Sequence, residues 1–293
     1  MLDIMLPFYG REDHFRTAVT SVLEQDSDDW RLVIIDDAYP DPSPGAWARG
    51  ISDPRVQYLR HEENRGINRT FQECLDLSTA PWVSVFGCDD VMEPGYVRRV
   101  AELTTRFPDA GIIHPGTDVI DADGEPARTI VDTAKAFYRP RGPRPLVLGG
   151  EQLAVSITRG NWMNFPSIAW HGPTVRSIGF RPDYQIVQDL ALALDVCRSG
   201  RTLVLDDELV FHYRRHRGSV SSWRAVDGTR FLEEREFFVS EAERFDGEGW
   251  HRAARAARRH LSSRINAATQ FVPALRAGDR TGARGLLAHA LGR

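Results

Sequence analysis

The sequence predicts an α/β fold with a mostly parallel central sheet flanked by helices, followed by a helical C-terminal extension. Short apolar runs alternate with segments of helical periodicity along the first third of the chain, which is typical of βαβ units. The runs are largely apolar, as strands covered on both faces require. Beyond residue 227 the chain is rich in Ala and Arg and lacks strand-like runs.

Four apolar runs in the first third are expected to be strands. They occupy residues 2–8, 31–37, 56–59 and 82–86. Between them, residues 15–25 and 67–78 place apolar side chains three and four positions apart, which predicts two helices. A loop rich in Pro, Ser and Gly separates the second strand from the third.

The second part of the chain is less regular. Helices are expected at 97–107 and 187–197. Residues 111–128 and 202–221 each have the pattern of short strands around a turn, and the Pro- and Arg-rich residues 133–148 are expected to form a loop.

Composition limits the classes of function. A net charge of −4 and a hydrophobic fraction of 42% are ordinary for a globular protein and give no reason to expect nucleic acid as a partner. The three Cys residues are widely spaced, which argues against a disulfide framework and favours a reducing compartment. The N-terminal run is too short and acidic for a signal peptide, and no stretch approaches the roughly 20 apolar residues of a membrane span. We therefore expect a cytoplasmic protein.

Polar residues directly follow three of the predicted strands. Tyr9 follows the first, Asp36 and Asp37 end the second, and Asp89 and Asp90 come just after the last. Because ligands of such sheets bind outside the carboxyl ends of the strands, we expect these side chains to share one edge. Adjacent carboxylates repel, so the last pair is either a hydrated surface turn or a site for a divalent cation and its anion.

Seven segments, in order, resemble the motifs of the family 2 glycosyltransferases, which have the GT-A fold. They are LPFYGRE, SVLEQDSDDWRLVIIDDAYPD, NRGINRTF, FGCDDVMEPGYV, IDADG, VQDLALALDVCRSG and YRRHRGSVS. The resemblance covers roughly residues 3–222. It implies a Rossmann-like GT-A domain whose residues 1–115 bind the nucleotide-sugar and whose residues 116–226 bind the acceptor and carry catalysis, with a helical extension at 227–293.

The resemblance implies a donor site at the first strand ends. Asp36 and Asp37 occupy the place where the family binds the nucleotide, and Asp37 is the stronger candidate because it lies further from the strand. A purely structural acidic turn is the alternative. Pro7 and Tyr9 are expected to line the base. The predicted donor-binding residues are Pro7, Tyr9, Asp36, Asp37, Asn64, Gly66, Asp89 and Arg214.

The segment FGCDDVM occupies the place of the family's Asp-x-Asp metal motif, but Gly87 stands where the family has its first Asp. Asp89 matches the Asp that contacts the metal, and Asp90 is expected to support it. His216 is expected to complete a site for Mn²⁺ or Mg²⁺, which would act as a Lewis acid on the departing diphosphate. A solvated His is the alternative, and Arg214 is either a diphosphate ligand or a surface charge.

Asp189 is the candidate catalytic residue. The family's Glu-Asp pair appears here as Gln188-Asp189, and the resemblance implies that the Asp accepts the proton of the acceptor hydroxyl. One base opposite the leaving group implies a single displacement with inversion at the anomeric carbon. Asp189 also lies near the start of a predicted helix, where capping is the alternative role. Asp183 is the second candidate base.

Residues 161–170 resemble the segment that faces the acceptor in the family. Aromatic rings stack on the C–H faces of sugars, and amides bond their hydroxyls. The predicted acceptor-binding residues are Asn161, Trp162, Asn164 and Ser167. Packing of the tryptophan in the core is the alternative.

The expected function is that of an inverting, metal-dependent glycosyltransferase of the hexosyltransferase type. It would move a sugar from a nucleoside diphosphate donor to a hydroxyl of a glycan, a lipid-linked carrier or a small molecule, in cell-surface glycan, polysaccharide or glycoconjugate biosynthesis. A nucleotidylyltransferase is one alternative, although the first strand lacks the Gly-rich, Lys-bearing loop expected of it. A non-catalytic nucleotide-sugar-binding relative is the other, suggested by Gly87.

The tail after residue 227 lies outside the resemblance. Residues 250–265 place an Ala-rich face opposite an Arg-rich one. Such a helix is expected to pack on the catalytic domain, to form a homodimer, or to make a peripheral contact with the inner face of the membrane.

Overall fold

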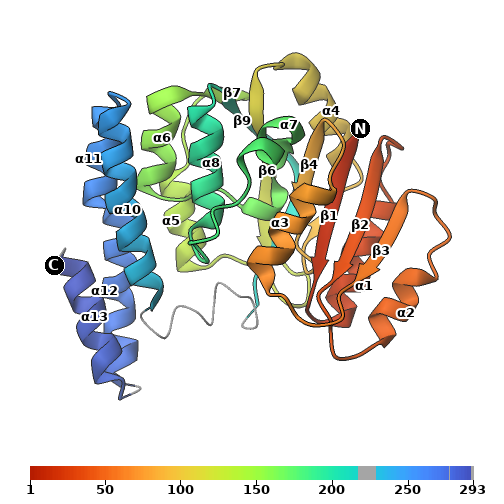
Figure 1. Ribbon diagram of the computed structural model, residues 1–293, viewed down its shortest axis with the longest axis horizontal. Coiled ribbons are helices and arrows are strands. Elements are labelled where there is room, and N and C mark those ends of the chain that lie inside the picture. Colours follow the sequence, from red (N-terminus) through yellow and green to blue (C-terminus); the bar gives the residue numbers. More distant parts are fainter. Residues whose placement is uncertain (217–228, 277, 292–293) are drawn as a thin grey trace.

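The computed structural model describes residues 1–216, 229–276 and 278–291. These residues form one nine-stranded sheet with helices on both faces (Figure 1). The strands are β1 (Leu2–Phe8), β2 (Trp30–Asp36), β3 (Val56–Arg60), β4 (Trp82–Val85), β5 (Val91–Met92), β6 (Ala110–Ile120), β7 (Leu146–Leu148), β8 (Ala169–His171) and β9 (Thr202–Arg214). Their order is β3-β2-β1-β4-β8-β6-β9-β5, and β7 pairs with β9 outside this path.

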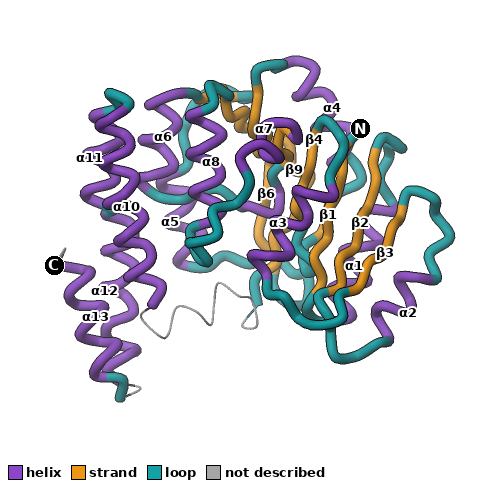
Figure 2. The backbone as a smooth tube through the Cα atoms, in the orientation of Figure 1, coloured by secondary structure: helices purple, strands orange, loops and turns teal. Residues whose placement is uncertain are grey.

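Helices follow or connect most of these strands. They are α1 (Glu12–Leu23), α2 (Ser43–Arg49), α3 (Ile67–Leu77), α4 (Tyr96–Arg106), α5 (Ile130–Tyr138), α6 (Gly150–Arg159), α7 (Gly172–Ile178), α8 (Gln188–Arg198), α10 (Thr229–Gly247), α11 (His251–Arg259), α12 (Leu261–Arg276) and α13 (Arg280–Leu291), with a 3₁₀ turn η1 (Phe165–Ser167). Figure 2 shows the sheet between its helical layers. The predicted α/β architecture with a central sheet and a helical C-terminal region is confirmed.

The N-terminal part of the sheet is parallel and the second part is mixed. β1 pairs in parallel with both β2 and β4, whereas β8 runs antiparallel to β4 and β6. Alternation along β1 separates the two faces, since Ile4 and Leu6 pack with α1 and α4 while Met5 packs with α3 and α8. Each fully buried side chain of this size contributes about 1.5–3 kcal/mol to stability.

Two predicted irregular regions are more ordered than expected. The predicted loop at 133–148 is wrong, because it contains most of α5 and all of β7. Helix α5 begins at a capping box in which Thr129 and Asp132 bond each other's backbone N–H. None of its residues is fully buried, and its apolar side chains Ile130 and Phe137 are 87% and 74% exposed. Helix α2 likewise lies inside the predicted Pro/Ser/Gly loop.

The predicted strand pairs at 111–128 and 202–221 are also wrong as described. Each contains one long strand, β6 or β9, and these two pair in parallel with register shifts near His114–Thr117. Gly116 explains one irregularity, because a Cβ there would lie 2.3 Å from the Glu208 carbonyl oxygen. After the Asp-Gly turn that follows β6, the chain pairs with β6 only through an isolated bridge between Ile120 and Pro126. The end of the last motif, residues 217–221, lies outside the described residues.

The helices after residue 229 divide into two groups. α10 and α11 contribute Phe237, Phe245 and Ala254 to the same hydrophobic core as α6 and α8. α12 and α13 form a hairpin (Figure 1), and their Ala267 and Leu286 pack with Phe231 of α10 in a separate small core. Within the described part of the chain, no helix is both long enough and apolar enough to cross a bilayer.

Candidate active site

The carboxyl ends of β1 and β2 lie side by side, as the sequence analysis expected. Phe8 is paired with Asp36, and the next residue, Asp37, donates its N–H to the Phe8 carbonyl at 3.0 Å. The first residue after β4, Phe86, donates its N–H to Met5 at 2.8 Å. The segments after the three strands therefore start from one edge of the sheet.

Asp36 is fully buried, and the protein itself holds its carboxylate. It accepts the Tyr39 N–H at 2.8 Å and the Tyr58 hydroxyl at 2.5 Å, and it forms an ion pair with Arg60. Between them the chain turns through Ala38, whose φ of 57° is rare for a residue with a side chain. As placed, Asp36 braces this turn, and its contact with nucleotide remains a prediction.

Asp37 organises the loop that contains the predicted donor residues Asn64 and Gly66. Its Oδ1 accepts the Arg65 N–H at 2.7 Å and its Oδ2 accepts the Gly66 N–H at 2.9 Å. Asn64 Oδ1 accepts the same Gly66 N–H at 3.0 Å. Gly66 has φ of +81°, a conformation that favours glycine. His61 Nδ1 lies 2.7 Å from Asp37 Oδ1 and completes this cluster.

An aromatic pair stands beside these carboxylates. Tyr9, directly after β1, is 53% exposed, and its ring meets that of Tyr39 edge-on at 5.5 Å. Pro7 lies within β1, next to Ile35 of β2. Tyr39 was not among the predicted site residues, although its position two residues after Asp37 was a usable signal. Exposed rings at this edge suit the face of a nucleotide base.

The predicted metal residues Asp89 and His216 are in contact. His216 Nε2 lies 2.8 Å from Asp89 Oδ2, and both side chains are partly exposed. Asp90 is 1% exposed, and its Oδ1 accepts the Arg214 N–H at 2.7 Å while its Oδ2 has no partner among the described residues. Burial, reinforced by the Asp89 charge, raises the pKa of Asp90 well above its ordinary value.

This donor set fits a divalent cation. Two neighbouring ligands of an octahedral ion lie about 3 Å apart, close to the observed separation of Asp89 and His216. A carboxylate with an imidazole suits Mn²⁺ better than Mg²⁺. Among the described residues, no group of three His, Cys, Asp or Glu side chains completes a metal site alone. Asp89 and His216 are the residues that would hold such an ion.

Gly87 is explained by the turn that it begins. A Cβ at this position would lie 2.3 Å from Asp90 Oδ2 and 3.2 Å from Asp89 Oδ1. The carboxylate that the family motif has here would thus compete for the space of Asp90. The glycine at position 87 therefore leaves the space that the buried Asp90 side chain occupies.

Arg214 is a brace in this structure. Its Nε donates to the Asp89 carbonyl at 2.7 Å and its Nη1 to the carbonyls of Asp121 and Ala122 at 2.9 and 3.2 Å. The side chain is 5% exposed. These contacts tie the metal-motif turn to the Asp-Gly turn after β6, and a direct diphosphate contact remains a prediction.

Helix α5, which the sequence analysis missed, connects the metal motif to the acceptor segment. Arg215 donates to Asp132 of α5 at 2.7 Å. From the same helix, Lys135 Nζ donates to the Met163 carbonyl at 2.6 Å and to Asn164 Oδ1 at 2.9 Å. Burial, aided by the Arg215 charge, lowers the pKa of Lys135 to about 8. Lys135 is the chain's only lysine, and that scarcity was the one signal for it.

The contacts continue to the predicted base. Asn161 Nδ2 donates to Asp189 Oδ2 at 3.2 Å, and Asp189 Oδ1 accepts the Leu190 N–H at 2.7 Å. Val187 holds the cap position of α8, so Asp189 lies in the first turn and is not the N-cap. Asn161 Oδ1 and Gln188 Oε1 are buried without a partner among the described residues.

The remaining predicted acceptor residues are buried. Trp162 is 2% exposed, and its Nε1 donates to Ser156 Oγ at 3.1 Å. Ser167 is fully buried, and its hydroxyl donates to the Asn164 carbonyl at 2.8 Å. Both side chains are bonded inside the protein and support the segment at 161–170. Their direct contact with the acceptor stays a prediction, and these bonds do not support it. Asp183 is exposed in the loop before α8.

The chain resembles known proteins in sequence and in fold. The model of the family described as "Glycosyl transferase family 2" matches residues 3–165, more than half of the chain. The succinoglycan biosynthesis protein ExoO of Rhizobium meliloti is 29% identical over 219 residues, which are 75% of this chain and 62% of ExoO. The chain therefore spans less than two thirds of that relative, and only 23% of another matched relative.

Two solved structures share the fold. S. aureus TarS 1–349 in complex with UDP-GlcNAc has a TM-score of 0.64 at 12% identity, covering all of this chain and 92% of that one. The mannosyltransferase PcManGT from Pyrobaculum calidifontis, in complex with GDP-Man and Mn²⁺, has a TM-score of 0.61 at 16% identity, covering 99% of this chain and 86% of that one.

Proposed function

The chain belongs to glycosyl transferase family 2, and from that premise we propose that it is an inverting, metal-dependent enzyme. It moves a sugar from a nucleoside diphosphate donor to a hydroxyl group of a glycan, lipid-linked or small-molecule acceptor. The contact between Asp89 and His216, at the edge of the sheet where Asp36 and Asp37 also lie, carries this proposal.

Three further observations support the proposed donor, metal and biosynthetic role. TarS was solved with UDP-GlcNAc and PcManGT with GDP-Man and Mn²⁺, and both share the fold of this chain. The pairing of a carboxylate with an imidazole beside a buried orphan carboxylate oxygen is suited to Mn²⁺. The likeness to a succinoglycan biosynthesis protein supports a role in polysaccharide or cell-surface glycan synthesis.

The residues divide the chemistry between them. Tyr9 and the Asp37 loop hold the nucleotide, and Asp89 and His216 would hold the cation beside the diphosphate. When bound, the cation neutralises the charge that develops on the departing diphosphate. A carboxylate oxygen of Asp189 accepts the proton of the acceptor hydroxyl as the hydroxyl oxygen attacks the anomeric carbon. A single base on the face opposite the leaving group implies one displacement with inversion.

The test is binding and transfer with defined donors. UDP and GDP, each with and without Mn²⁺, should raise the melting temperature of the protein, more strongly with the metal. Asp89→Asn should remove the metal-dependent part of that rise while the fold stays intact. Asp123→Asn, a change at an exposed carboxylate in the nearby turn, should leave it unchanged. Equal metal-dependent binding by Asp89→Asn would sink the assignment.

A cytoplasmic location, with a homodimer or a peripheral membrane contact through the C-terminal helices, is also part of the proposal. Four apolar side chains along α12 are 47–55% exposed and suit a partner surface: Leu261, Ile265, Val272 and Leu275. Sedimentation in the presence and absence of anionic vesicles would separate the two arrangements.

A further inference from the structure

Helix α10 reaches back to the helix that carries the proposed base. One carboxylate oxygen of Glu233 accepts the backbone N–H groups of three consecutive residues, Gln185 at 2.9 Å, Ile186 at 2.6 Å and Val187 at 3.2 Å. These N–H groups lie immediately before α8, and Asp189 follows in its first turn. Successive backbone N–H groups at a helix start form a concave site for an anion, and here the occupant comes from the C-terminal region.

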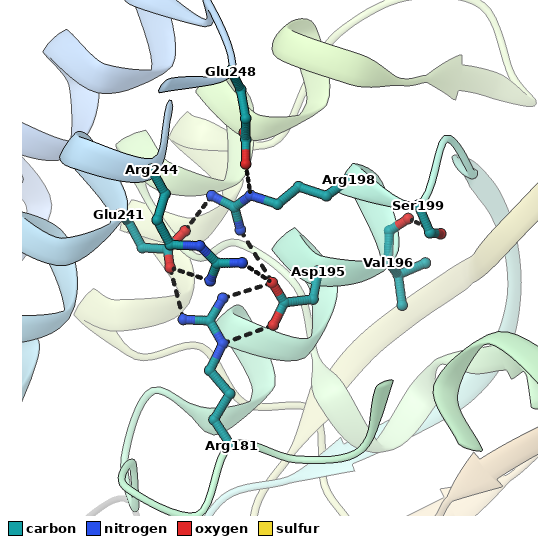
Figure 3. A network of polar contacts seen from close by, with 8 residues as sticks. All are labelled: Arg181, Asp195, Val196, Arg198, Ser199, Glu241, Arg244 and Glu248. Atoms are coloured by element: carbon teal, nitrogen blue, oxygen red, sulfur yellow. Dashed lines mark hydrogen bonds and ion pairs between the residues drawn. The ribbon is translucent and has the colours of Figure 1, made fainter. Parts of the chain in front are cut away.

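A second set of contacts holds the rest of α8 against α10. Glu241, which is fully buried, accepts from Arg181 at 2.7 Å and from Arg198 at 2.5 Å. Arg244 of α10 donates to Asp195 of α8 at 3.1 Å. Figure 3 shows that these charges converge between the two helices. This network holds the middle and the C-terminal end of α8 against α10. Glu233, in contrast, contacts the backbone directly before the first turn of α8.

The two sets of contacts have different consequences. Loss of a partner in the Glu241 network leaves buried charges uncompensated and weakens the fold. Loss of Glu233 frees three N–H groups in a turn that is partly exposed, while Phe237 still packs edge-on against Tyr184 at 5.2 Å. The second change therefore acts on the direction of the 185–189 turn more than on the stability of the protein.

We propose that Glu233 is a positioning residue for the transfer reaction: its carboxylate holds the backbone of residues 185–187 and so sets where Asp189 presents its carboxylate. This inference rests on the proposed role of Asp189 as base. It gives the C-terminal helices a part in the reaction that the family motifs do not include. Because a misplacement of about 1 Å at a reacting group costs up to ~10²-fold in rate, a small shift of this turn is enough to matter.

The experiment measures kcat and donor KM in full-length variants. Glu233→Ala should lower kcat by about 10–100-fold while donor KM and Mn²⁺-dependent nucleotide binding stay within about 2-fold of wild type. Glu233→Gln keeps a carbonyl oxygen at the same reach and should recover most of kcat. Glu236→Ala, at an exposed carboxylate of the same helix, is the matched control and should leave kcat unchanged.

A folded Glu233→Ala protein with wild-type kcat would overturn the inference, and so would a parallel loss of nucleotide binding and melting temperature. If Glu233→Ala does not fold, Glu233→Asp, one methylene shorter, takes its place, and unchanged kcat there is equally decisive. Asp189→Asn distinguishes failure of the proposed base from failure of the positioning role of Glu233. If it leaves transfer intact, the proposed base is wrong; if it abolishes transfer while Glu233→Ala has no effect, only the positioning role fails. Added to Asp189→Asn, Glu233→Ala should lower kcat no further.

Discussion

Replacing Gly87 with alanine is expected to damage both the stability of the protein and its metal-dependent nucleotide binding. A Cβ on Gly87 would lie 2.3 Å from Asp90 Oδ2, 3.1 Å from Asp90 Cγ and 3.2 Å from Asp89 Oδ1. Asp90 has little room to retreat, because it is 1% exposed and its other oxygen accepts the Arg214 N–H. The added methyl group must therefore displace either this side chain or the backbone of the turn.

The size of the effect follows from the contact. Overpacking at a buried site costs about 1–3 kcal/mol, and each kcal/mol lowers the melting temperature by about 2–4 °C in a domain of 150–250 residues. Because Asp89 lies in the same turn, we also expect binding of UDP or GDP with Mn²⁺ to weaken at least ~10-fold, which is about 1.4 kcal/mol. Thermal denaturation measures the first quantity and calorimetric titration the second.

Gly247→Ala provides the matched control. A Cβ there meets nothing within 4 Å, and alanine in the last turn of α10 should be neutral or stabilising by up to about 1 kcal/mol. A Gly87→Ala protein that melts and binds like wild type would refute the reasoning. That result would mean that Asp90 moves at no cost and that its buried position is not what excludes a side chain at residue 87.

Three more outcomes are expected. Asp37→Ala should weaken nucleotide binding at least ~10-fold, because lost bonds to a charged group cost about 1.5–3 kcal/mol; normal affinity in a titration of the folded variant would refute the role. In His212, burial opposes the charged form, but the bonds to Glu93 and Asp118 outweigh burial and raise its pKa above 6.5. Protonated His212 thus stabilises the fold below about pH 6.5, and this contribution is lost as pH rises through the raised pKa. Denaturant unfolding should show a larger deficit of His212→Gln near pH 6 than near pH 9, and an equal deficit at both would contradict it. Asp189→Asn should keep melting temperature and donor binding while transfer falls at least ~10²-fold, as expected of a general base; transfer within a few-fold of wild type would leave Asp189 a structural residue and move attention to Asp183.

Sequence patterns predicted the elements whose buried face is apolar. The strands β1, β2 and β4 and the helix α8 carry continuous or periodic apolar residues, so their positions were expected to within a few residues. Helix α5 escaped because its inward side is polar, with Asp132 and Lys135 bonded to Arg215 and Asn164. Its apolar residues Ile130 and Phe137 face solvent, so polar contacts and a cap hold this helix in place of an apolar core, and the Pro and Arg residues that follow it suggested a loop.

Which residues belong to the candidate site was more predictable from the sequence than the contacts that they make. That Asp89 and His216 meet was implied by the resemblance, and the structure places them 2.8 Å apart. The bonds from the Arg214 guanidinium to the backbone carbonyls of Asp89, Asp121 and Ala122 were not foreseeable, because these carbonyls lie 92 to 125 residues away in sequence. Partners of this kind are chosen by tertiary packing, which leaves no local pattern.

The contacts of α10 show why the chain after residue 227 is more than an appendage to the motifs. Its aromatic side chains Phe237 and Phe245 are fully buried in the main core, and each contributes about 1.5–3 kcal/mol by burial. The ion pairs of Glu241 contribute less net stability, because desolvation offsets most of their attraction. Their effect is on alignment: a shift of α10 by one residue would part Glu241 from Arg181 and Arg198 together and leave charges buried without partners. Hydrophobic burial thus holds α10 on the domain, the Glu241 network fixes its register on α8, and that register brings Glu233 to the turn before Asp189.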